Sequence, residues 1–190
     1  MEPRETFLIT AAEIRDVFGM PEALRCTERA FRLYGEGNVQ MPPKLYLTFE
    51  RGDLRSMPVY LPTLGIAGVK NVTVHPGNRD LPAVMATITL VDPDTGFPLA
   101  VMDGTYLTRL RTGAAGALAA SYLAREDARV AGFVGAGRQA ETQLDGLMIT
   151  RPAISKVLAY DLDADRSSRF CLRCRERYGI EAASTGSIEE

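Results

Sequence analysis

A glycine-containing segment in the last third of the chain has the residue types needed to hold a nucleotide. It reads Val130-Ala131-Gly132-Phe133-Val134-Gly135-Ala136-Gly137-Arg138-Gln139-Ala140. The G-x-G-x-x-A pattern is typical of the turn that joins a strand to a helix in dinucleotide-binding domains. Gly135 would permit the tight turn, Gly137 would let the backbone approach a pyrophosphate, and Ala140 would keep the helix close to the strand. The N–H groups at the helix start would then bind the phosphate oxygens.

A carboxylate follows this turn at the spacing at which such domains bind the ribose of the cofactor. Asp161 ends the next apolar run, about 20 residues after the glycines. Its carboxylate would accept hydrogen bonds from the adenosine ribose and would repel a 2′-phosphate, which favours NAD over NADP. Asp163 would add to that preference, whereas Arg166 leaves NADP open. We therefore expect NAD as the cofactor, with NADP as the alternative.

The elements around the glycine turn alternate between strand and helix. Apolar runs and amphipathic segments predict strands over 128–134 and 156–161 and from 180 to 183, and helices after the turn and over 166–178. Strands that alternate with helices form a parallel sheet. The fold class is therefore α/β here, and residues 126–190 are expected to be the first half of a Rossmann dinucleotide-binding domain.

Residues 1–125 have a different pattern, in which helices precede an antiparallel sheet. Thr10 and Glu13 fit a capping box, and a second helix is predicted from Pro21 to the glycines after Tyr34. Alternating apolar residues and turn signals predict strands over 44–49, 54–60, 67–74, 85–91 and 99–102. A helix rich in glycine and alanine follows over 108–123, and we expect it to pack tightly against a sheet.

Composition and charge argue against several functional classes. The net charge of −2 gives no electrostatic reason to expect a nucleic acid or an anionic membrane as a partner. No apolar run approaches the ~20 residues that span a bilayer, and the polar start, Met1 to Glu5, does not fit a signal peptide. The odd number of cysteines, three, favours a reducing compartment, so we expect a cytoplasmic protein. Cys171 and Cys174 have no second pair or adjacent histidine, so no metal site is expected.

A series of ordered motifs gives the sequence a family resemblance. They are Ala30–Tyr34, Met41–Lys44, Gly52–Pro58, Gly68–Lys70, His75–Asn78, Thr95–Asp103, Leu110–Ala115 and Gly135–Ala140. Together they make the chain resemble the ornithine cyclodeaminase/μ-crystallin family, most closely its archaeal alanine dehydrogenase branch. The resemblance implies an α+β domain over residues 1–125 that binds substrate and forms a homodimer, followed by the Rossmann domain.

The family resemblance also implies an activity. Its members oxidise an amino acid or reduce an imine with a nicotinamide cofactor, and the alanine dehydrogenase branch converts L-alanine, NAD and water reversibly to pyruvate, ammonia and NADH. Three alternatives stay open, namely an ornithine cyclodeaminase, a ketimine reductase, and a non-catalytic crystallin-like protein that binds the cofactor. These alternatives use the same residues, so the sequence does not identify the amino acid or imine.

The matched motifs assign residues to the substrate. Lys70, in G-x-K, matches the catalytic lysine, and Arg55, in L-R-x-M-P, matches a ligand of the substrate carboxylate. Lys44 lies where many cyclodeaminases carry an arginine that faces the same carboxylate, and lysine there fits the alanine dehydrogenase branch. Arg111 matches a position that contacts substrate as well as cofactor. His75, the only histidine, lies in a Pro-Gly-Asn turn and is expected to have a loop or supporting role.

The same motifs assign residues to the cofactor. Arg111 and Thr112 match positions that contact the cofactor phosphates and the substrate side of the nicotinamide, and Arg138 and Gln139 lie on the pyrophosphate turn. In the family, an aspartate in the second half of the Rossmann domain assists the release of ammonia. The sequence ends near the third predicted strand, so we expect it to lack this C-terminal part and its aspartate.

Overall fold

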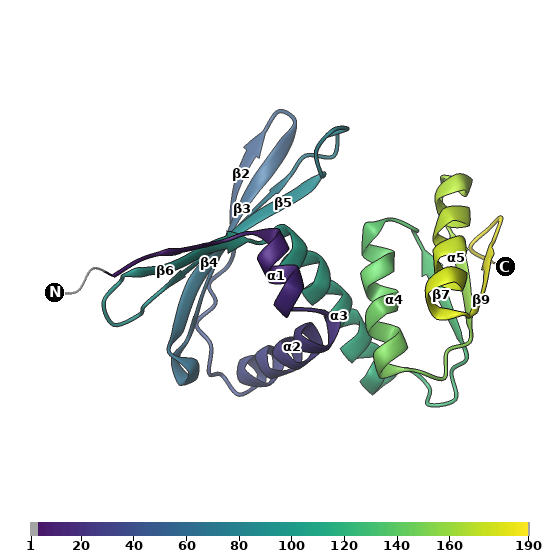
Figure 1. Cartoon of the computed structure of the whole chain (residues 1–190), viewed down its shortest axis with the longest axis horizontal. Coiled ribbons are helices and arrows are strands. Elements are labelled where there is room, and N and C mark those ends of the chain that lie inside the picture. The colour runs from purple at the N-terminus through teal and green to yellow at the C-terminus, as the bar shows by residue number, and fades with distance from the viewer. Residues whose placement is uncertain (1–3, 190) are drawn as a thin grey trace. The chain divides into compact units, whose positions relative to one another are not determined.

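The computed structural model describes residues 4–189 and divides the chain into two compact units (Figure 1). Unit 1 comprises Met1–Gly19 and Arg29–Thr108, and unit 2 comprises Met20–Glu28 and Arg109–Glu190. Within the described residues, the strands form a six-stranded sheet in unit 1 and a three-stranded sheet in unit 2. The predicted mixed α/β fold class is thus confirmed.

The sheet of unit 1 follows the alternation in the sequence. Its elements are β1 (Phe7–Ile9), α1 (Ala11–Val17), β2 (Leu45–Phe49), β3 (Gly52–Leu61), a 3₁₀ helix (Pro62–Leu64), β4 (Ile66–Val74), β5 (Val84–Val91) and β6 (Pro98–Asp103). The strand order is β1-β6-β5-β4-β3-β2, with antiparallel pairing from β2 through β6 as predicted. The sequence analysis missed β1, which pairs in parallel with β6.

Two helices contribute residues to both units. The first, α2 (Met20–Gly35), follows α1, whose N-terminus has the predicted capping box between Thr10 and Glu13. The second, α3 (Thr105–Leu123), begins directly after β6 and carries the glycine- and alanine-rich segment. Its N-terminus is fixed in unit 1 by Thr105, whose hydroxyl accepts a hydrogen bond from the backbone N–H of Ala86 at 3.0 Å.

Unit 2 has the strand–helix alternation of a half Rossmann domain. Its remaining elements are β7 (Val130–Val134), α4 (Arg138–Thr150), β8 (Lys156–Tyr160), α5 (Ala164–Tyr178) and β9 (Glu181–Ser184). The strands pair in parallel in the order β7-β8-β9, because each α-helix returns the chain to the same end of the sheet. The sheet therefore places the turns after β7 and β8 at one edge.

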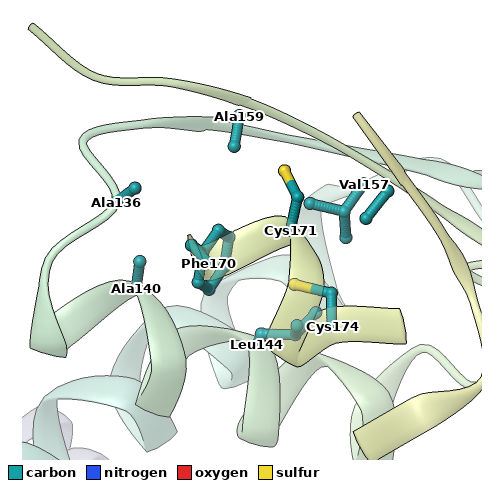
Figure 2. Packing of buried hydrophobic residues seen from close by; sticks show 9 residues of the cluster. Ala136, Ala140, Leu144, Val157, Ala159, Phe170, Cys171 and Cys174 are labelled. Atoms are coloured by element: carbon teal, nitrogen blue, oxygen red, sulfur yellow. The ribbon is translucent and has the colours of Figure 1, made fainter. Parts of the chain in front are cut away.

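The hydrophobic core of unit 2 lies between the sheet and the two helices. Leu144 of α4, Phe170 of α5 and Val157 of β8 belong to one buried cluster, in which Figure 2 shows Cys171 beside Val157 and Cys174 beside Leu144. Cys171 and Cys174 belong to this core, and burial raises the pKa of the Cys174 thiol to about 11. The thiols therefore act here as small apolar groups.

The glycines of α3 pack against a helix, which corrects the expectation of helix–sheet packing. A Cβ atom on Gly113 would overlap the carbonyl oxygen of Thr142 in α4. Gly146 of α4 makes the reciprocal contact, because a Cβ there would lie 2.6 Å from the Cβ of Ala117. Small residues on both helices thus bring α3 and α4 into close contact within unit 2.

Candidate functional site

The cationic residues predicted to bind substrate lie on one face of the unit 1 sheet. In the strand register, Arg55 of β3 is opposite Tyr46 of β2, and Lys70 of β4 is opposite Met57 of β3. Alternate residues of a strand share a face, and so do residues that are paired across two strands. Arg55 and Met57 therefore lie on the same face as Lys70, the partner of Met57. Lys44, just before β2, joins them, because its Nζ lies 5.4 Å from the centroid of the Tyr46 ring.

The guanidinium of Arg55 is held by two neighbours that the sequence analysis did not identify. Its Nε and Nη2 donate to the two carboxylate oxygens of Asp53 at 2.7 and 2.9 Å. Its Cζ lies 5.4 Å from the centroid of the Tyr46 ring. The bonds from Arg55 lower the pKa of Asp53, and the same bonds raise the pKa of Arg55. The two-residue spacing along a strand was the sequence signal for this pair.

Lys70 lies inside the sheet rather than at its edge. β4 has β3 on one side and β5 on the other, so the lysine is flanked by Met57 and Ile88. The residue is half-buried. The predicted role of Lys70 in accepting a proton stays a prediction.

A cavity of about 660 Å³ opens beside this cluster, at the end of the β2–β3 hairpin. Its lining includes Tyr46, Asp53 and His75 but neither Arg55 nor Lys70. The His75 ring stacks on Phe49 at a centroid distance of 6.1 Å, and its Nδ1 is buried without a hydrogen-bond partner among the described residues. His75 therefore borders the cavity, and its predicted loop role stays a prediction.

The predicted glycine turn in unit 2 joins β7 to α4. Gly135 has a φ of +96°, which favours glycine, and its N–H donates to the carbonyl oxygen of Tyr160 at 2.7 Å. Gly137, the N-cap of α4, has φ −78° and ψ −174°, which any residue adopts, and a Cβ there would meet nothing within 4 Å. The fold thus needs glycine at position 135, whereas at position 137 it leaves space for a ligand to approach the backbone.

Asp161 is bonded to this turn. Its Oδ2 accepts the N–H of Ala136 at 2.7 Å, and its Oδ1 accepts the N–H of Asp163 at 3.0 Å. The bond from Ala136 is the main cause that lowers the pKa of Asp161, so the group is ionised at neutral pH. Arg166 Nη1 lies 3.6 Å from Oδ1. The carboxylate therefore holds the glycine turn, and its side chain is only 9% exposed, so its predicted contact with ribose stays a prediction.

Asp163 has a structural role in the fold, and its predicted role at the cofactor stays a prediction. It is the N-cap of α5, and its Oδ1 accepts the backbone N–H of Arg166 at 3.1 Å. The Arg166 guanidinium also lies 3.7 Å from its Oδ2. The structure thus brings both predicted carboxylates and the glycine turn together at one edge of the parallel sheet.

The remaining predicted cofactor residues lie on α3 and at the start of α4. Arg111 of α3 is exposed and has no hydrogen bond or ion pair with any residue of the described part of the chain. Partial desolvation lowers the pKa of Arg111, but a guanidinium remains charged at neutral pH. The carbonyl oxygen of Thr112 accepts a bond from Gln143 at 3.2 Å, which ties this segment to α4.

Arg138 and Gln139 begin α4. The Nε2 of Gln139 donates to the carbonyl oxygen of Arg109 and to Thr142 Oγ1, at 3.2 and 2.6 Å, so this side chain supports the α3–α4 contact. The N–H of Ala140 donates to the carbonyl oxygen of Gly137 at 3.0 Å, whereas the N–H groups that precede it at a helix start have no partner within the helix. The positive charge of Arg138 at a helix N-terminus opposes the helix dipole, which makes a bound anion there favourable.

Among residues 4–189, no helix is both long and apolar enough to cross a membrane. Within the same residues, no group of three or more histidine, cysteine, aspartate or glutamate side chains is placed to hold a metal ion.

Comparison with protein families agrees with the resemblance. The model of the ornithine cyclodeaminase/mu-crystallin family matches residues 4–190. An alanine dehydrogenase from Archaeoglobus fulgidus is 51% identical over 181 residues, which are 94% of this chain and 55% of that protein. The chain thus spans about half the length of the curated relatives it matches.

Solved structures are similar over almost the whole chain. An archaeal alanine dehydrogenase dimer with bound NAD has a TM-score of 0.92 and 49% identity, over 98% of this chain and 57% of that one. A Δ1-pyrroline-2-carboxylate reductase from Thermococcus litoralis, in complex with NADH and L-proline, has a TM-score of 0.91 and 37% identity, over 96% and 58%.

Proposed function

The chain belongs to the ornithine cyclodeaminase/mu-crystallin family, and from this premise we propose that it forms part of an NAD-dependent enzyme that acts on the CH–NH2 group of a small amino acid. The proposed reaction is the reversible conversion of L-alanine, NAD and water to pyruvate, ammonia and NADH. The observation that carries the proposal is the open backbone at Gly137, in a turn held by Asp161.

The cofactor part of the proposal uses unit 2. The N–H groups at the start of α4, with Arg138, would bind the pyrophosphate, and Arg111 supplies a cation on α3 that forms no ion pair within residues 4–189. Asp161 would accept the ribose hydroxyls and disfavour a 2′-phosphate, so we propose NAD rather than NADP. When bound, NAD supplies the hydride acceptor.

The substrate part of the proposal uses unit 1. Arg55 and Lys44 would bind the amino-acid carboxylate through charge-assisted hydrogen bonds, which fixes the substrate while its Cα–H bond breaks. Lys70 would accept the proton that the substrate amine releases. The half-buried position of Lys70, between β3 and β5, places it on the same face of the sheet as Arg55.

The choice of alanine is supported by similarity to the Archaeoglobus fulgidus enzyme at 51% identity. A second candidate is the reduction of a cyclic imino acid, because a similar solved structure is a reductase with NADH and L-proline bound. Both reactions need a carboxylate anchor and a hydride carrier. They differ in the space needed for the side chain.

We also propose that the protein is a cytoplasmic homodimer. β2 lies at the edge of its sheet, and one face of it exposes Leu45, Leu47 and Phe49. An apolar edge of this kind is suited to association with a second copy. The similar archaeal alanine dehydrogenase is a dimer. The three free cysteines support a reducing compartment.

The function is tested by titrating the 190-residue protein with NADH and following energy transfer from tyrosine to the nicotinamide. Pyruvate and ammonia are then added, and the loss of NADH absorbance is recorded. The same assay is repeated with Δ1-pyrroline-2-carboxylate, the substrate of the second candidate reaction. NADH binding with turnover of pyruvate is the expected result. Binding without turnover would reject the activity for this chain and keep the cofactor claim, whereas the absence of binding would contradict both.

A further inference from the structure

The ion pair between Asp53 and Arg55 has a consequence for substrate choice. Both residues lie on the same face of β3, two positions apart, and the pair is bidentate with distances of 2.7 and 2.9 Å. The Asp53 side chain is 24% exposed and that of Arg55 is 33% exposed. A pair with this geometry and limited solvent access is better fixed than an ordinary surface ion pair.

This pair uses one edge of the guanidinium. The Nε and one N–H of Nη2 are directed at Asp53, so a ligand carboxylate is left the edge formed by Nη1 and the second N–H of Nη2. The Tyr46 ring, 5.4 Å from Arg55 Cζ, further restricts how the guanidinium can turn. Arg55 thus presents a single binding edge for one carboxylate group.

Asp53 also changes the charge of the cluster. Lys44 and Arg55 contribute two positive charges around the Tyr46 ring, with Lys70 on the same face, and the ionised Asp53 offsets the charge of Arg55. The Nε edge of Arg55 and the positive charge of Arg55 are therefore already used by Asp53 and are not available to a second carboxylate on a ligand. Like charges at such distances repel by an amount that changes affinity severalfold.

We propose that Asp53 is a specificity-determining residue that restricts the anchor formed by Lys44 and Arg55 to monocarboxylate substrates and disfavours dicarboxylates. The proposal rests on the proposed function, in which this anchor binds the carboxylate of an amino or keto acid. Asp53 acts through Arg55 and through its own charge, without contact to the substrate. A neutral residue at position 53 would release the second edge of Arg55.

The test compares two unreactive anions, propionate and malonate, which have three carbons each and differ in one carboxylate. Binding to the 190-residue protein is followed by NMR through the Arg55 Nε–H resonance, in the wild type, in Asp53→Asn and in the control Asp80→Asn. Asp80 is exposed and makes no hydrogen bond or ion pair within the described part of the chain. The Arg55 resonance reports directly on the bond to Asp53, so it separates loss of the pair from loss of the fold.

We expect Asp53→Asn to shift the Arg55 Nε–H resonance, to strengthen propionate binding about threefold and to strengthen malonate binding roughly tenfold, because a dianion gains twice from the removed charge. Asp80→Asn should leave both affinities unchanged. Equal factors for the two anions, or an unmoved Arg55 resonance, would overturn the proposal while the anchor stands. If propionate perturbs neither Arg55 nor Lys44 in the wild type, the anchor in the proposed function fails, and the selection by Asp53 fails with it.

Discussion

The carboxylate of Asp161 accepts two backbone N–H groups, from Ala136 and from Asp163, and both bonds favour its ionised form. From the sequence, Asp161 was expected only to bind ribose. The structure adds that it fixes the glycine turn from which a pyrophosphate would be bound. The spacing after the fingerprint predicted the position, but a hydrogen bond to a neighbouring loop depends on the path of both loops.

The lowered pKa of Asp161 predicts how stability changes with pH. Its contribution to the free energy of unfolding is complete above the ordinary aspartate value of about 3.9, and it is lost as the pH falls through the lower value of the folded protein. Asp161→Asn removes this titration. We expect the difference in urea midpoint between wild type and variant to be constant from neutral pH to about 4 and to shrink below it.

The control for this experiment is Asp94→Asn, which changes an exposed aspartate in the turn before β6. The urea midpoint of Asp94→Asn should differ little from that of the wild type at every pH. The role of the ionised carboxylate would be contradicted if the difference in urea midpoint between wild type and Asp161→Asn stayed the same down to the lowest pH at which both proteins fold.

The helices and strands show which elements can be predicted from local sequence patterns. Alternation of apolar residues predicted β2 through β6, and the capping residues predicted the start of α1, because both signals are local. β1 was missed because it has three residues and is defined by its pairing with β6, about 90 residues away. Pairing over such a distance is not encoded in local periodicity.

The sequence also did not predict which element packs against α3. A run of small residues such as Gly113 to Ala117 indicates close packing, but the same run suits a sheet or another helix. The α3–α4 contact depends on Gly146, whose role is visible only once the two helices are placed. Similarly, the two-residue period of a strand predicts that Asp53 and Arg55 share a face, but it does not predict their bidentate geometry.

The α3–α4 contact can be tested by Gly113→Ala. Alanine favours a helix over glycine by up to about 1 kcal/mol, so the substitution would stabilise an exposed position. Here the new Cβ overlaps the backbone oxygen of Thr142, and one helix must move. We expect the free energy of unfolding to fall by about 1–3 kcal/mol in urea titrations.

Gly132→Ala is the matched control, because a Cβ on Gly132 in β7 would meet nothing within 4 Å. It should leave the free energy of unfolding unchanged or raise it slightly. If Gly113→Ala were as stable as this control, the close contact between the helices would not exist in solution.

Association of two copies is tested at the exposed face of β2. Leu47 is 60% exposed there, and Leu81, in the loop between β4 and β5, is equally exposed. Leu47→Arg would bury a charge if β2 pairs with a second copy, so we expect the dimer to dissociate at concentrations at least about tenfold higher than in the wild type. Light scattering after size exclusion measures this, with Leu81→Arg as the control. A dimer that is insensitive to Leu47→Arg would place the interface elsewhere.

The central claim is that this protein binds NAD through the backbone at Gly137, and NADH titration of the wild type and of Gly137→Ala tests it most directly. The backbone conformation at this position suits alanine, and the new Cβ meets no protein atom within 4 Å, so the urea midpoint should not change. The same Cβ fills the space that a pyrophosphate needs, so NADH affinity should fall at least about tenfold. Gly77→Ala, at an equally open position in a loop of unit 1, should bind NADH like the wild type. A Gly137→Ala protein that binds NADH as tightly as the wild type, or a folded wild type that does not bind NADH, would contradict the account.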